Sequence, residues 1–396
     1  MAAPEVTFNP FDPAVMVDPY PYYSRMRELD PVHWSQAIRT WFLTRHVDVV
    51  ELLRDDRFSA DRTLSERFRP PPPHRRRPGK SMLVVDPPDH TRLRNLVNKA
   101  FTPRMVERLR PRIESITTEI LDRAAGADGF DLVTDFAYPL PVIVIAEMLG
   151  VPPKDRVAFQ RWSAILVRGL DPMIGDEEQE AVFDARDALL DYLRGVLAER
   201  RREPQEDMLT NLIAAEESGD MFSEGELLAM CNLLLVAGHE TTVNLMGNGV
   251  LALFEKPDQL DRLRRDPDLI RTGADELLRY TSPVQWTGRV ATAEIGIGGR
   301  TIQPLQSVTG ILAAANRDPD VFSDPDCLDL GRHPNPHLAF GRGIHFCLGA
   351  PLAVLEAQVA IPMLLERFPR LRLAGEPELR PTWVLRGLRR LPVAAA

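Results

Sequence analysis

The sequence predicts a mainly α-helical protein with a minor β part, on three observations. Apolar residues recur at helical spacing, with Pro and Gly between the segments, at residues 89–100, 104–125, 176–202, 223–255, 267–280 and 348–368. Strand-like patterns are few, with WFLT at 41–44, ahead of the helical HVDVVELLRDD, and stretches at 288–312 and 382–393. The segment 223–255 opens with the capping box SEGE and ends before Pro257. At about 1.5 Å per residue it would be roughly 50 Å long, which favours a single domain over residues 1–396.

Composition and charge exclude several classes of protein. A net charge of −9 argues against nucleic acid or an anionic membrane surface as the main partner. The cysteines are three, an odd number without paired spacing, so we expect no disulfide framework and a cytoplasmic location. The N-terminus lacks a signal-peptide pattern, and the most apolar run, 227–238, is followed at once by His239 and Glu240. An acidic enzyme without a membrane span is the expectation.

The stretch RFRPPPPHRRRPGK at 67–80 is the one segment of low complexity. Four consecutive prolines favour polyproline II, and the arginines repel one another, so a solvated loop is expected. A ligand for a proline-binding domain and a contact to an acidic substrate remain open alternatives.

The hexapeptide AGHETT at 237–242 lies within the long helical segment. Ala237 and Thr241 are four residues apart and share a face with Leu234, so a small residue and a hydroxyl would line one wall. Gly238 weakens the helix, and the Thr241 hydroxyl can bond the carbonyl of residue 237, which favours a bend with room for a small ligand. A helix-packing notch is the alternative. His239 points to nearly the opposite side and is interpreted as structural.

AFGRGIHFCLG at 339–349 brings glycines, a histidine and a cysteine together. Gly341 and Gly343 allow positive φ and a close approach of the backbone to a flat ligand. Cys347 would sit at the start of the helix 348–368, where the helix N-terminus lowers the pKa of a thiol and favours a thiolate that binds a metal. Zinc held by His333, His337, His345 and Cys347 is an alternative, and so is an inert turn with a buried cysteine.

Two further pairs have helical spacing. Glu276 and Arg279 in DELLRY are three apart, and most such pairs are exposed and weak. His90 and Arg94, four apart near a helix start with Asp89 as the candidate N-cap, would present two donors suited to a carboxylate. Two solvated polar residues are the alternative there.

The four segments HTRLR, AGHETT, ELLR and FGRGIHFCLG, in this order, resemble the cytochrome P450 superfamily, specifically its soluble bacterial members. The resemblance runs from WFLTRHVDVVELLRDDRFS through NRDPDVFSDPD to RGLRRLPV and displaces the zinc interpretation. It implies the cytochrome P450 fold, with a long central helix crossing over a buried haem b and small β-sheets at one side.

The resemblance also implies roles for individual residues. Cys347 would be the axial thiolate ligand of the haem iron, and Glu240 and Thr241 would be the acid and alcohol that handle dioxygen and protons. The residues implied for haem binding are His90, Arg94, Ala237, Gly238, Arg289, Phe340, Gly341 and His345. Of these, His90, Arg94, Arg289 and His345 would hold the propionates, and Phe340 would pack near the sulfur. Glu276, Arg279 and Arg332 would form a buried structural network.

The implied activity is insertion of one oxygen atom from dioxygen into a C–H bond, or epoxidation, of a medium or large apolar molecule such as a macrolide, terpenoid, steroid or fatty acid. Leu234, Val284, Trp286 and Trp383 are the expected pocket residues. GIGG at 296–299 lacks the third glycine of a dinucleotide motif, so a ferredoxin or flavodoxin-type donor with a separate NAD(P)H reductase is expected, docking near Arg342 on a monomer. A haem peroxygenase and a haem sensor are the alternatives.

Overall fold

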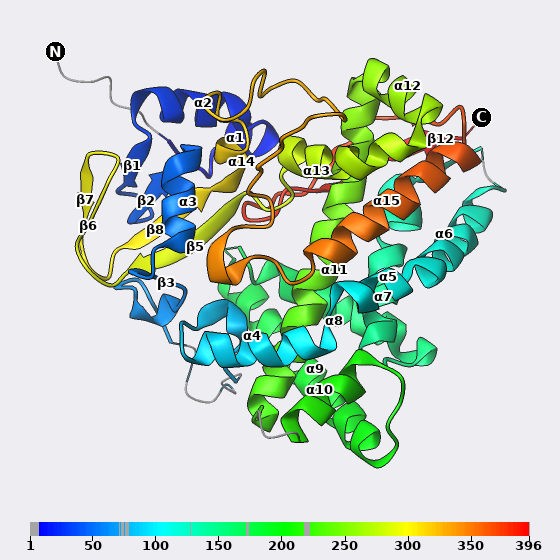
Figure 1. Cartoon of the computed structure of the whole chain (residues 1–396), viewed down its shortest axis with the longest axis horizontal. Helices are drawn as coiled ribbons and strands as arrows, with labels where there is room; N and C mark the ends of the chain where they lie inside the picture. Colours follow the sequence, from blue (N-terminus) through cyan, green and yellow to red (C-terminus); the bar gives the residue numbers. More distant parts are fainter. Residues whose placement is uncertain are drawn as a thin grey trace.

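The computed structural model describes residues 8–395, apart from positions 71, 73–74, 76–78, 127, 172–173 and 218–221. Helices fill the right-hand part of Figure 1, and the largest sheet lies at the left. The helices are α1 (Pro13–Val17), α2 (Tyr20–Leu29), α3 (His46–Arg54), α4 (Asp89–Ala100), α5 (Pro103–Arg108), α6 (Arg110–Ala124), α7 (Pro139–Met148), α8 (Arg156–Arg168), α9 (Asp176–Arg202), α10 (Met208–Glu217), α11 (Glu224–Glu255), α12 (Pro257–Arg265), α13 (Ile270–Thr281), α14 (Leu312–Ala315) and α15 (Ala350–Arg367).

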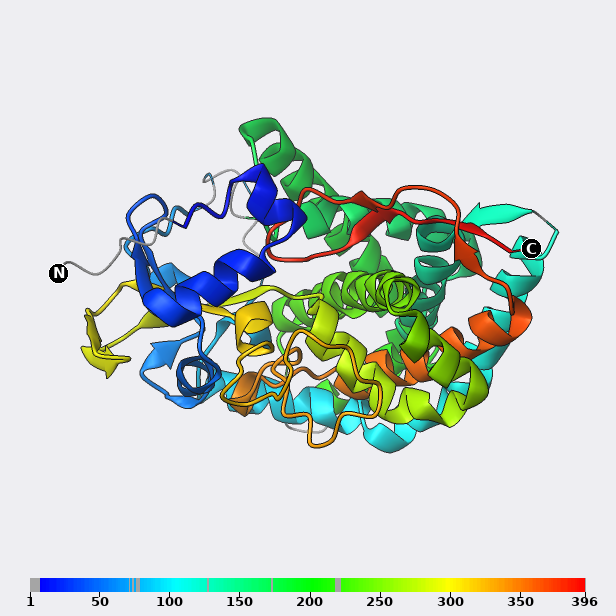
Figure 2. The same cartoon turned by 90° about the horizontal axis from the view of Figure 1, so that it is seen from above.

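The strands are short and form several small sheets. They are β1 (Val32–Ser35), β2 (Thr40–Leu43), β3 (Phe58–Ser59), β4 (Gly129–Asp131), β5 (Trp286–Ala291), β6 (Ile295–Ile297), β7 (Arg300–Ile302), β8 (Ser307–Ile311), β9 (Arg372–Leu373), β10 (Glu378–Leu379), β11 (Leu388–Arg390) and β12 (Pro392–Ala394). The largest sheet has the order β1-β2-β8-β5-β3, in which β2 and β8 are parallel and the other neighbours antiparallel. Strand β12 pairs with β4 and β9 at the end of the molecule opposite the β6–β7 hairpin (Figure 2).

Helix α11 runs through the middle of the molecule (Figure 1). Its start is the predicted capping box, in which Ser223 Oγ accepts the Glu226 N–H at 3.3 Å and a Glu226 carboxylate oxygen accepts the Ser223 N–H at 2.9 Å. It ends at Glu255, with Lys256 as its C-cap just before Pro257 begins α12. Most of its residues are buried on all sides, as expected for a helix that is packed within a core.

The predicted helices agree closely at α4, α9 and α11, and four expectations are corrected. The helix expected at 104–125 is two helices, because Pro111 lies in the first turn of α6, where its missing N–H costs no hydrogen bond. The segment 267–280 opens as a 3₁₀ turn, Pro267–Leu269, before α13. Asp89 is not the N-cap of α4, since Pro88 occupies that position. In 382–393, strand structure begins only at Leu388.

The expected loop at 67–80 falls partly outside the described residues, which omit positions 71, 73–74 and 76–78. The described ones form no helix or strand. Arg75 lies against α9, where it pairs with Glu180 and, at 2.7 Å, with Asp184. Its guanidinium also lies 5.5 Å from the ring centroid of Phe183. The described part of the loop is therefore tied to α9 by charge and by a cation–π contact.

Candidate functional site

The loop that carries Cys347, before α15, is held by a hydrogen bond within its own backbone. Gly341 and Gly343 both have a φ of +71°, as the sequence predicted, and the Cys347 N–H donates to the Phe340 carbonyl at 2.9 Å. A side chain at position 343 would place its Cβ only 2.4 Å from the Leu53 carbonyl oxygen, at the end of α3. Glycine at 343 therefore lets this loop pack directly on α3.

The sulfur of Cys347 lies at the beginning of α15. It accepts hydrogen bonds from the backbone N–H groups of Gly349 and Ala350, which lower the pKa of the thiol together with the nearby charge of Arg94. Burial outweighs them, so the pKa of the free thiol is raised, contrary to the expected lowering. Although protein surrounds Cys347 on most sides, the residue keeps accessible surface. A positive ion at the sulfur would stabilise the thiolate that burial opposes.

Four cationic or basic side chains lie close to one another, and one of them, Arg94, is close enough to the Cys347 sulfur to lower the pKa of its thiol. The rings of His90 and His345 lie 4.3 Å apart, and Arg94 and Arg289 are close enough to affect them. Burial, followed by the charge of Arg289, lowers the pKa of His345 to about 3. Burial also lowers the pKa of Arg289 to about 10 and lowers that of Arg94. The group is thus desolvated and mutually repulsive.

These four side chains have no carboxylate partner among the described residues. Arg289 donates to Gly288 O at 2.8 Å and to Thr287 Oγ1 at 3.4 Å, both neutral acceptors. His90 Nε2 is buried without any hydrogen-bond partner. Asp86, whose charge raises the pKa values of His90, Arg289 and His345, is already bonded to Ser59 and to the Ala60 N–H. Because Arg94 and Arg289 are partly buried without an acidic partner among the described residues, the cluster fits an anionic group such as a carboxylate.

Arg62 belongs with this cluster, and the sequence analysis missed it. Burial lowers the pKa of Arg62, and its charge in turn lowers that of Arg289. It follows β3 in a 3₁₀ turn, Arg62–Leu64, capped by Asp61. No motif marks this position, and the only signal in the sequence is an arginine shortly after a strand.

On α11, Thr241 and Glu240 lie beside one another with different partners. The Thr241 hydroxyl donates to the Ala237 carbonyl at 3.0 Å, as expected, and α11 is helical without interruption through Gly238. Glu240 is only 3% exposed and forms an ion pair with Arg380. Arg380 follows β10, 140 positions along the chain from Glu240, and sequence reasoning missed it because no spacing pattern connects the two.

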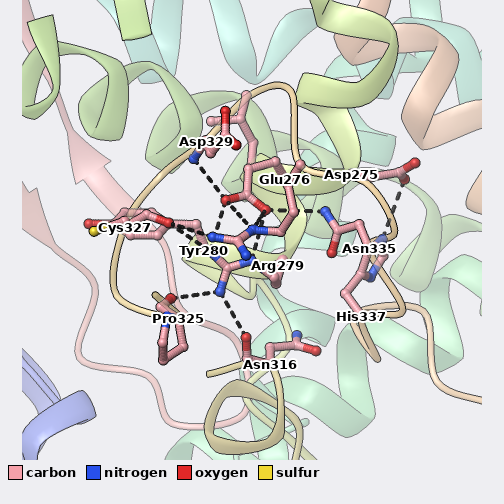
Figure 3. A network of polar contacts seen from close by, with 12 residues as sticks. Asp275, Glu276, Arg279, Tyr280, Asn316, Pro325, Cys327, Asp329, Asn335 and His337 are labelled. Carbon is pink, nitrogen blue, oxygen red and sulfur yellow. Dashed lines mark hydrogen bonds and ion pairs between the residues drawn. The ribbon is translucent and has the colours of Figure 1, made fainter. Parts of the chain in front are cut away.

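Glu276 and Arg279 form the centre of a buried polar network (Figure 3). Both side chains are 0% exposed and share two hydrogen bonds of 2.8 Å. Arg332 donates to the same carboxylate at 3.1 Å, and Asn335 Nδ2 does so at 3.1 Å. Arg279 also donates to the carbonyls of Asn316, Pro325 and Cys327. The alternative of an exposed pair is wrong.

The zinc alternative fails on geometry. Within the described part of the chain, no three His, Cys, Asp or Glu side chains form a group that could hold a metal ion. His337 instead lies 3.4 Å from Asp275, and its Nδ1 accepts the Ala339 N–H. His345 lies against His90. Cys347 therefore has no second metal-ligating side chain grouped with it in the described part of the chain.

The four expected pocket residues do not form one group. Leu234 is buried on α11, and Val284 forms an isolated β-bridge with Leu385. Trp286 donates its indole N–H to the Tyr23 hydroxyl at 3.0 Å and lies edge-on to Trp383. Their role in a substrate pocket stays a prediction.

Comparison with known proteins agrees with this geometry. The Cytochrome P450 family profile matches residues 32–384. Cytochrome P450 107B1 of Saccharopolyspora erythraea is 48% identical over 97% of this chain and 96% of its own. Vitamin D(3) 25-hydroxylase of Pseudonocardia autotrophica is 44% identical over 95% of this chain and 93% of its own.

A solved structure has the same fold. The cytochrome P450 PksS of the Bacillus subtilis bacillaene polyketide synthase superimposes with a TM-score of 0.92 at 38% identity, over 98% of this chain and all of that one. In the part of the chain that the structure describes, no helix has the length and apolar character needed to cross a bilayer. Cys347 lies on a loop with two glycines at positive φ, and the basic cluster has no carboxylate partner among the described residues. Together with the family profile, the similar sequences and the superimposed structure, these features show that the chain belongs to the cytochrome P450 family of haem-containing monooxygenases.

Proposed function

We propose that this protein inserts one oxygen atom from dioxygen into a C–H bond, or across a double bond, of a medium or large apolar molecule, using haem b bound through Cys347. The observation that carries the proposal is the Cys347 sulfur, which accepts two backbone N–H groups and keeps accessible surface within the protein. A thiolate held in this way is the ligand that promotes oxygen activation by haem iron.

The residues present fit haem b. Haem b carries two propionate carboxylates, and His90, Arg94, Arg289 and His345 form a desolvated group that has no carboxylate partner among the described residues. The orphaned His90 Nε2 is a buried atom in need of a partner. When bound, the haem supplies the iron at which dioxygen is activated.

The chain's own residues would bind, orient and deliver protons. Cys347 would hold the iron, and the N–H groups of Gly349 and Ala350 would moderate the charge on its sulfur. Because the Thr241 hydroxyl donates to Ala237, its oxygen keeps lone pairs free to accept a hydrogen bond from a water. Glu240, next in sequence, would exchange protons with solvent. Glu276, Arg279 and Arg332 would keep the cysteine loop in place.

Electrons would come from a ferredoxin or flavodoxin-type protein with a separate NAD(P)H reductase. Arg342, in the loop that carries Cys347, offers a positive charge to an acidic donor on that side of the molecule. The compartment would be cytoplasmic, in keeping with three cysteines that are all free.

The substrate would be large and apolar. The relatives whose names state a substrate or a pathway include a vitamin D(3) hydroxylase and a polyketide synthase P450. A steroid-like or polyketide-like molecule is therefore the class with which a compound panel should begin, with terpenoids and fatty acids after it.

The decisive experiment is the carbon monoxide difference spectrum of the reduced, haem-loaded protein. We expect the Soret band that a thiolate ligand gives, and we expect Cys347→Ala to lose it. Cys327→Ala is the matched control, because Cys327 is an exposed free cysteine whose described hydrogen bonds use only its backbone N–H and carbonyl. A folded, haem-loaded wild-type protein without the thiolate-type band would refute the proposal, with circular dichroism as the check on folding.

A further inference from the structure

A cavity of about 260 Å³ lies between α2 and the chain that follows α14. The two helices lie next to one another at the upper left of Figure 1. Tyr20, Ser24 and Arg27 line the α2 side of the cavity, and Ala314 and Arg317 line the other side. None of the described residues that line it is assigned above to the haem, to proton transfer or to the buried polar network. At roughly 30 Å³ per water molecule, the cavity has room for a small organic molecule.

Arg27 brings a positive charge to this cavity and has no ion-pair partner among the described residues. Its Nη1 donates to the Ala314 carbonyl at 3.0 Å and its Nη2 to Ser24 Oγ at 3.4 Å, and both acceptors are neutral. Burial lowers the pKa of Arg27, and the charges of acids beyond ion-pair distance, led by Asp318, oppose this effect. Asp318 itself already accepts two backbone N–H groups. Since a guanidinium has five N–H groups, Arg27 keeps donors for a ligand.

Arg317, on the opposite wall, also has a donor without a partner. Its side chain is 12% exposed and lies between the rings of Tyr20 and Tyr280. Nη1 donates to an Asp326 carboxylate oxygen and Nη2 to the Tyr280 carbonyl, both at 2.9 Å. Nε is buried and has no hydrogen-bond partner among the described residues. Buried polar groups of proteins are almost always hydrogen-bonded, so this N–H favours an acceptor that a ligand supplies.

The acidic groups at the cavity lie toward solvent. The Asp326 side chain is 74% exposed and is paired with Arg317. Asp18 is exposed and accepts the Tyr20 N–H at 3.2 Å. Water and salt screen both carboxylates, whereas Arg27 is half-buried. The two acids still repel negative charge, so a singly charged ligand fits better than inorganic phosphate, which is partly doubly charged at neutral pH.

The rest of the lining is apolar or already hydrogen-bonded. Pro21 is apolar. The buried Tyr23 hydroxyl accepts the Trp286 indole N–H at 3.0 Å and faces Gln285 Oε1 at 3.4 Å. The Tyr20 hydroxyl donates to a backbone carbonyl, that of residue 280 or 281. A ligand that fits this lining therefore has a carboxylate at one end and an apolar or aromatic body at the other.

We infer that this cavity is a second ligand site of the protein and takes a small aromatic monocarboxylate. The carboxylate would pair with Arg27 and accept the Nε–H of Arg317, because a guanidinium presents its N–H groups in a fork that matches a carboxylate. The aromatic body would lie against Tyr20 and Pro21. The inference does not depend on the proposed function, since none of the described residues that line the cavity takes part in that function.

A ligand in this cavity would connect two parts of the fold. One wall is α2, and the other continues into the loop whose carbonyls at Asn316 and Pro325 accept hydrogen bonds from Arg279. A ligand that binds only the folded protein stabilises it by mass action. At a free concentration about ten times the dissociation constant, the ratio of folded to unfolded protein should therefore rise about elevenfold.

The test is isothermal titration calorimetry of the haem-loaded protein with benzoate at low ionic strength. We expect saturable binding at a single site, and Arg27→Gln should weaken it at least about tenfold, because a charge-assisted pair is lost. Ser24→Phe, which places a ring in the cavity and keeps Arg27, should weaken binding by a similar factor. Benzyl alcohol has the same ring without the charge and should bind the wild type at least about tenfold more weakly than benzoate.

The matched control is Arg25→Gln, because Arg25 is exposed on the same helix and does not line the cavity. It should leave the affinity for benzoate unchanged. The Soret band is recorded through the same titration and should not move, because the cavity contains none of the described residues placed at the haem. Circular dichroism checks that each variant folds.

Two results in the wild type alone would overturn the inference, and neither needs a variant to fold. They are the absence of saturable benzoate binding up to about 10 mM and tighter binding of inorganic phosphate or benzyl alcohol than of benzoate. Equal affinity in the wild type and a folded Arg27→Gln would also overturn it. So would a Soret shift that follows saturation, because it would place the benzoate at the haem. A wild type without the thiolate-type carbon monoxide band would refute the proposed function but not the benzoate site.

Discussion

Arg279 lies three residues after Glu276, a spacing that usually gives an exposed and weak ion pair, but this pair is buried. It is 0% exposed, and it divides its donors between the Glu276 carboxylate and three backbone carbonyls. Arg279→Met should lower the free energy of unfolding by about 3–5 kcal/mol, because it leaves a buried charge with less compensation. Urea unfolding of the haem-free protein measures this.

The matched control for that change lies on the same helix. Arg271 pairs with Asp268 at 3.1 Å, but both side chains are more than three-quarters exposed. Arg271→Met should cost no more than about 1 kcal/mol. Equal losses of unfolding free energy in Arg279→Met and Arg271→Met would contradict the view that burial makes the Glu276 network important for stability.

Glu356 makes stability depend on pH. It is buried on α15, and burial outweighs a hydrogen bond with Thr242 and raises its pKa from 4.5 to about 8. The folded state therefore keeps a proton that the unfolded state loses, and stability falls as pH rises from about 4.5 through about 8.

Glu356→Gln tests this dependence, because it keeps the shape and removes the titration. The wild type should lose up to about 4 kcal/mol between pH 4.5 and pH 8 relative to the glutamine variant. Urea midpoints at several pH values measure the difference. Parallel curves for the two proteins would contradict it.

Features that depend on neighbouring residues in the sequence could be predicted, whereas contacts between residues far apart in the sequence could not. The glycines around Cys347 and the back-bond of Thr241 follow from neighbours in sequence. Arg62 and Arg380 do not, because their partners lie in other elements and no residue spacing records the contact. The burial of Glu276 could likewise not be read from i and i+3 spacing alone.

At the scale of elements, sequence prediction succeeded where a helix has an apolar period, charges that match its dipole, or a capping box at its start. Helix α9 has three acidic residues in its first turn and three arginines in its last, in accord with the helix dipole, and its bounds were predicted as 176–202. Helix α7, PLPVIVIAEM, has β-branched and apolar residues on every side and is buried. It offers no period, so its limits could not be predicted.

Arg75 gives the loop at 67–80 an anchor on α9. Its side chain is 16% exposed and faces Glu180, Asp184 and the ring of Phe183. Arg75→Gln should increase the rate of limited proteolysis within 67–80 several-fold, and added salt should do the same to the wild type, because salt screens the pairs. Mass spectrometry of the fragments measures the rate.

The control for that experiment is Arg194→Gln, on the same helix, whose pair with Asp191 does not involve the loop. Unchanged proteolysis in Arg75→Gln would show that the loop is held by other contacts.

At the scale of the whole molecule, the sheet side and the helical side are joined by buried polar contacts. The Arg317 guanidinium lies between the rings of Tyr20 and Tyr280, 3.4 Å and 4.4 Å from their centroids. Asn316 accepts from Arg279 with its carbonyl and from the Leu338 N–H with its side chain. These contacts favour the proposal that the chain unfolds as a single domain.

The tryptophans make that proposal testable. Trp34, Trp41 and Trp286 belong to the five-stranded sheet, whereas circular dichroism at the helical band reports mainly the other side. We expect fluorescence and circular dichroism to follow one urea transition in the haem-free protein. A fluorescence midpoint clearly below that of circular dichroism would mean that the sheet side is a domain of its own.

The parallel pairing of β2 with β8 has a consequence for how the protein is made. Thr40 of β2 lies opposite Ser307 of β8, 267 positions further along the chain. At about 5–20 residues per second, a ribosome needs roughly 13 to 50 seconds to supply that partner. During this time one edge of the nascent β1–β2 hairpin has no neighbour, and the cell must keep it from pairing with other chains.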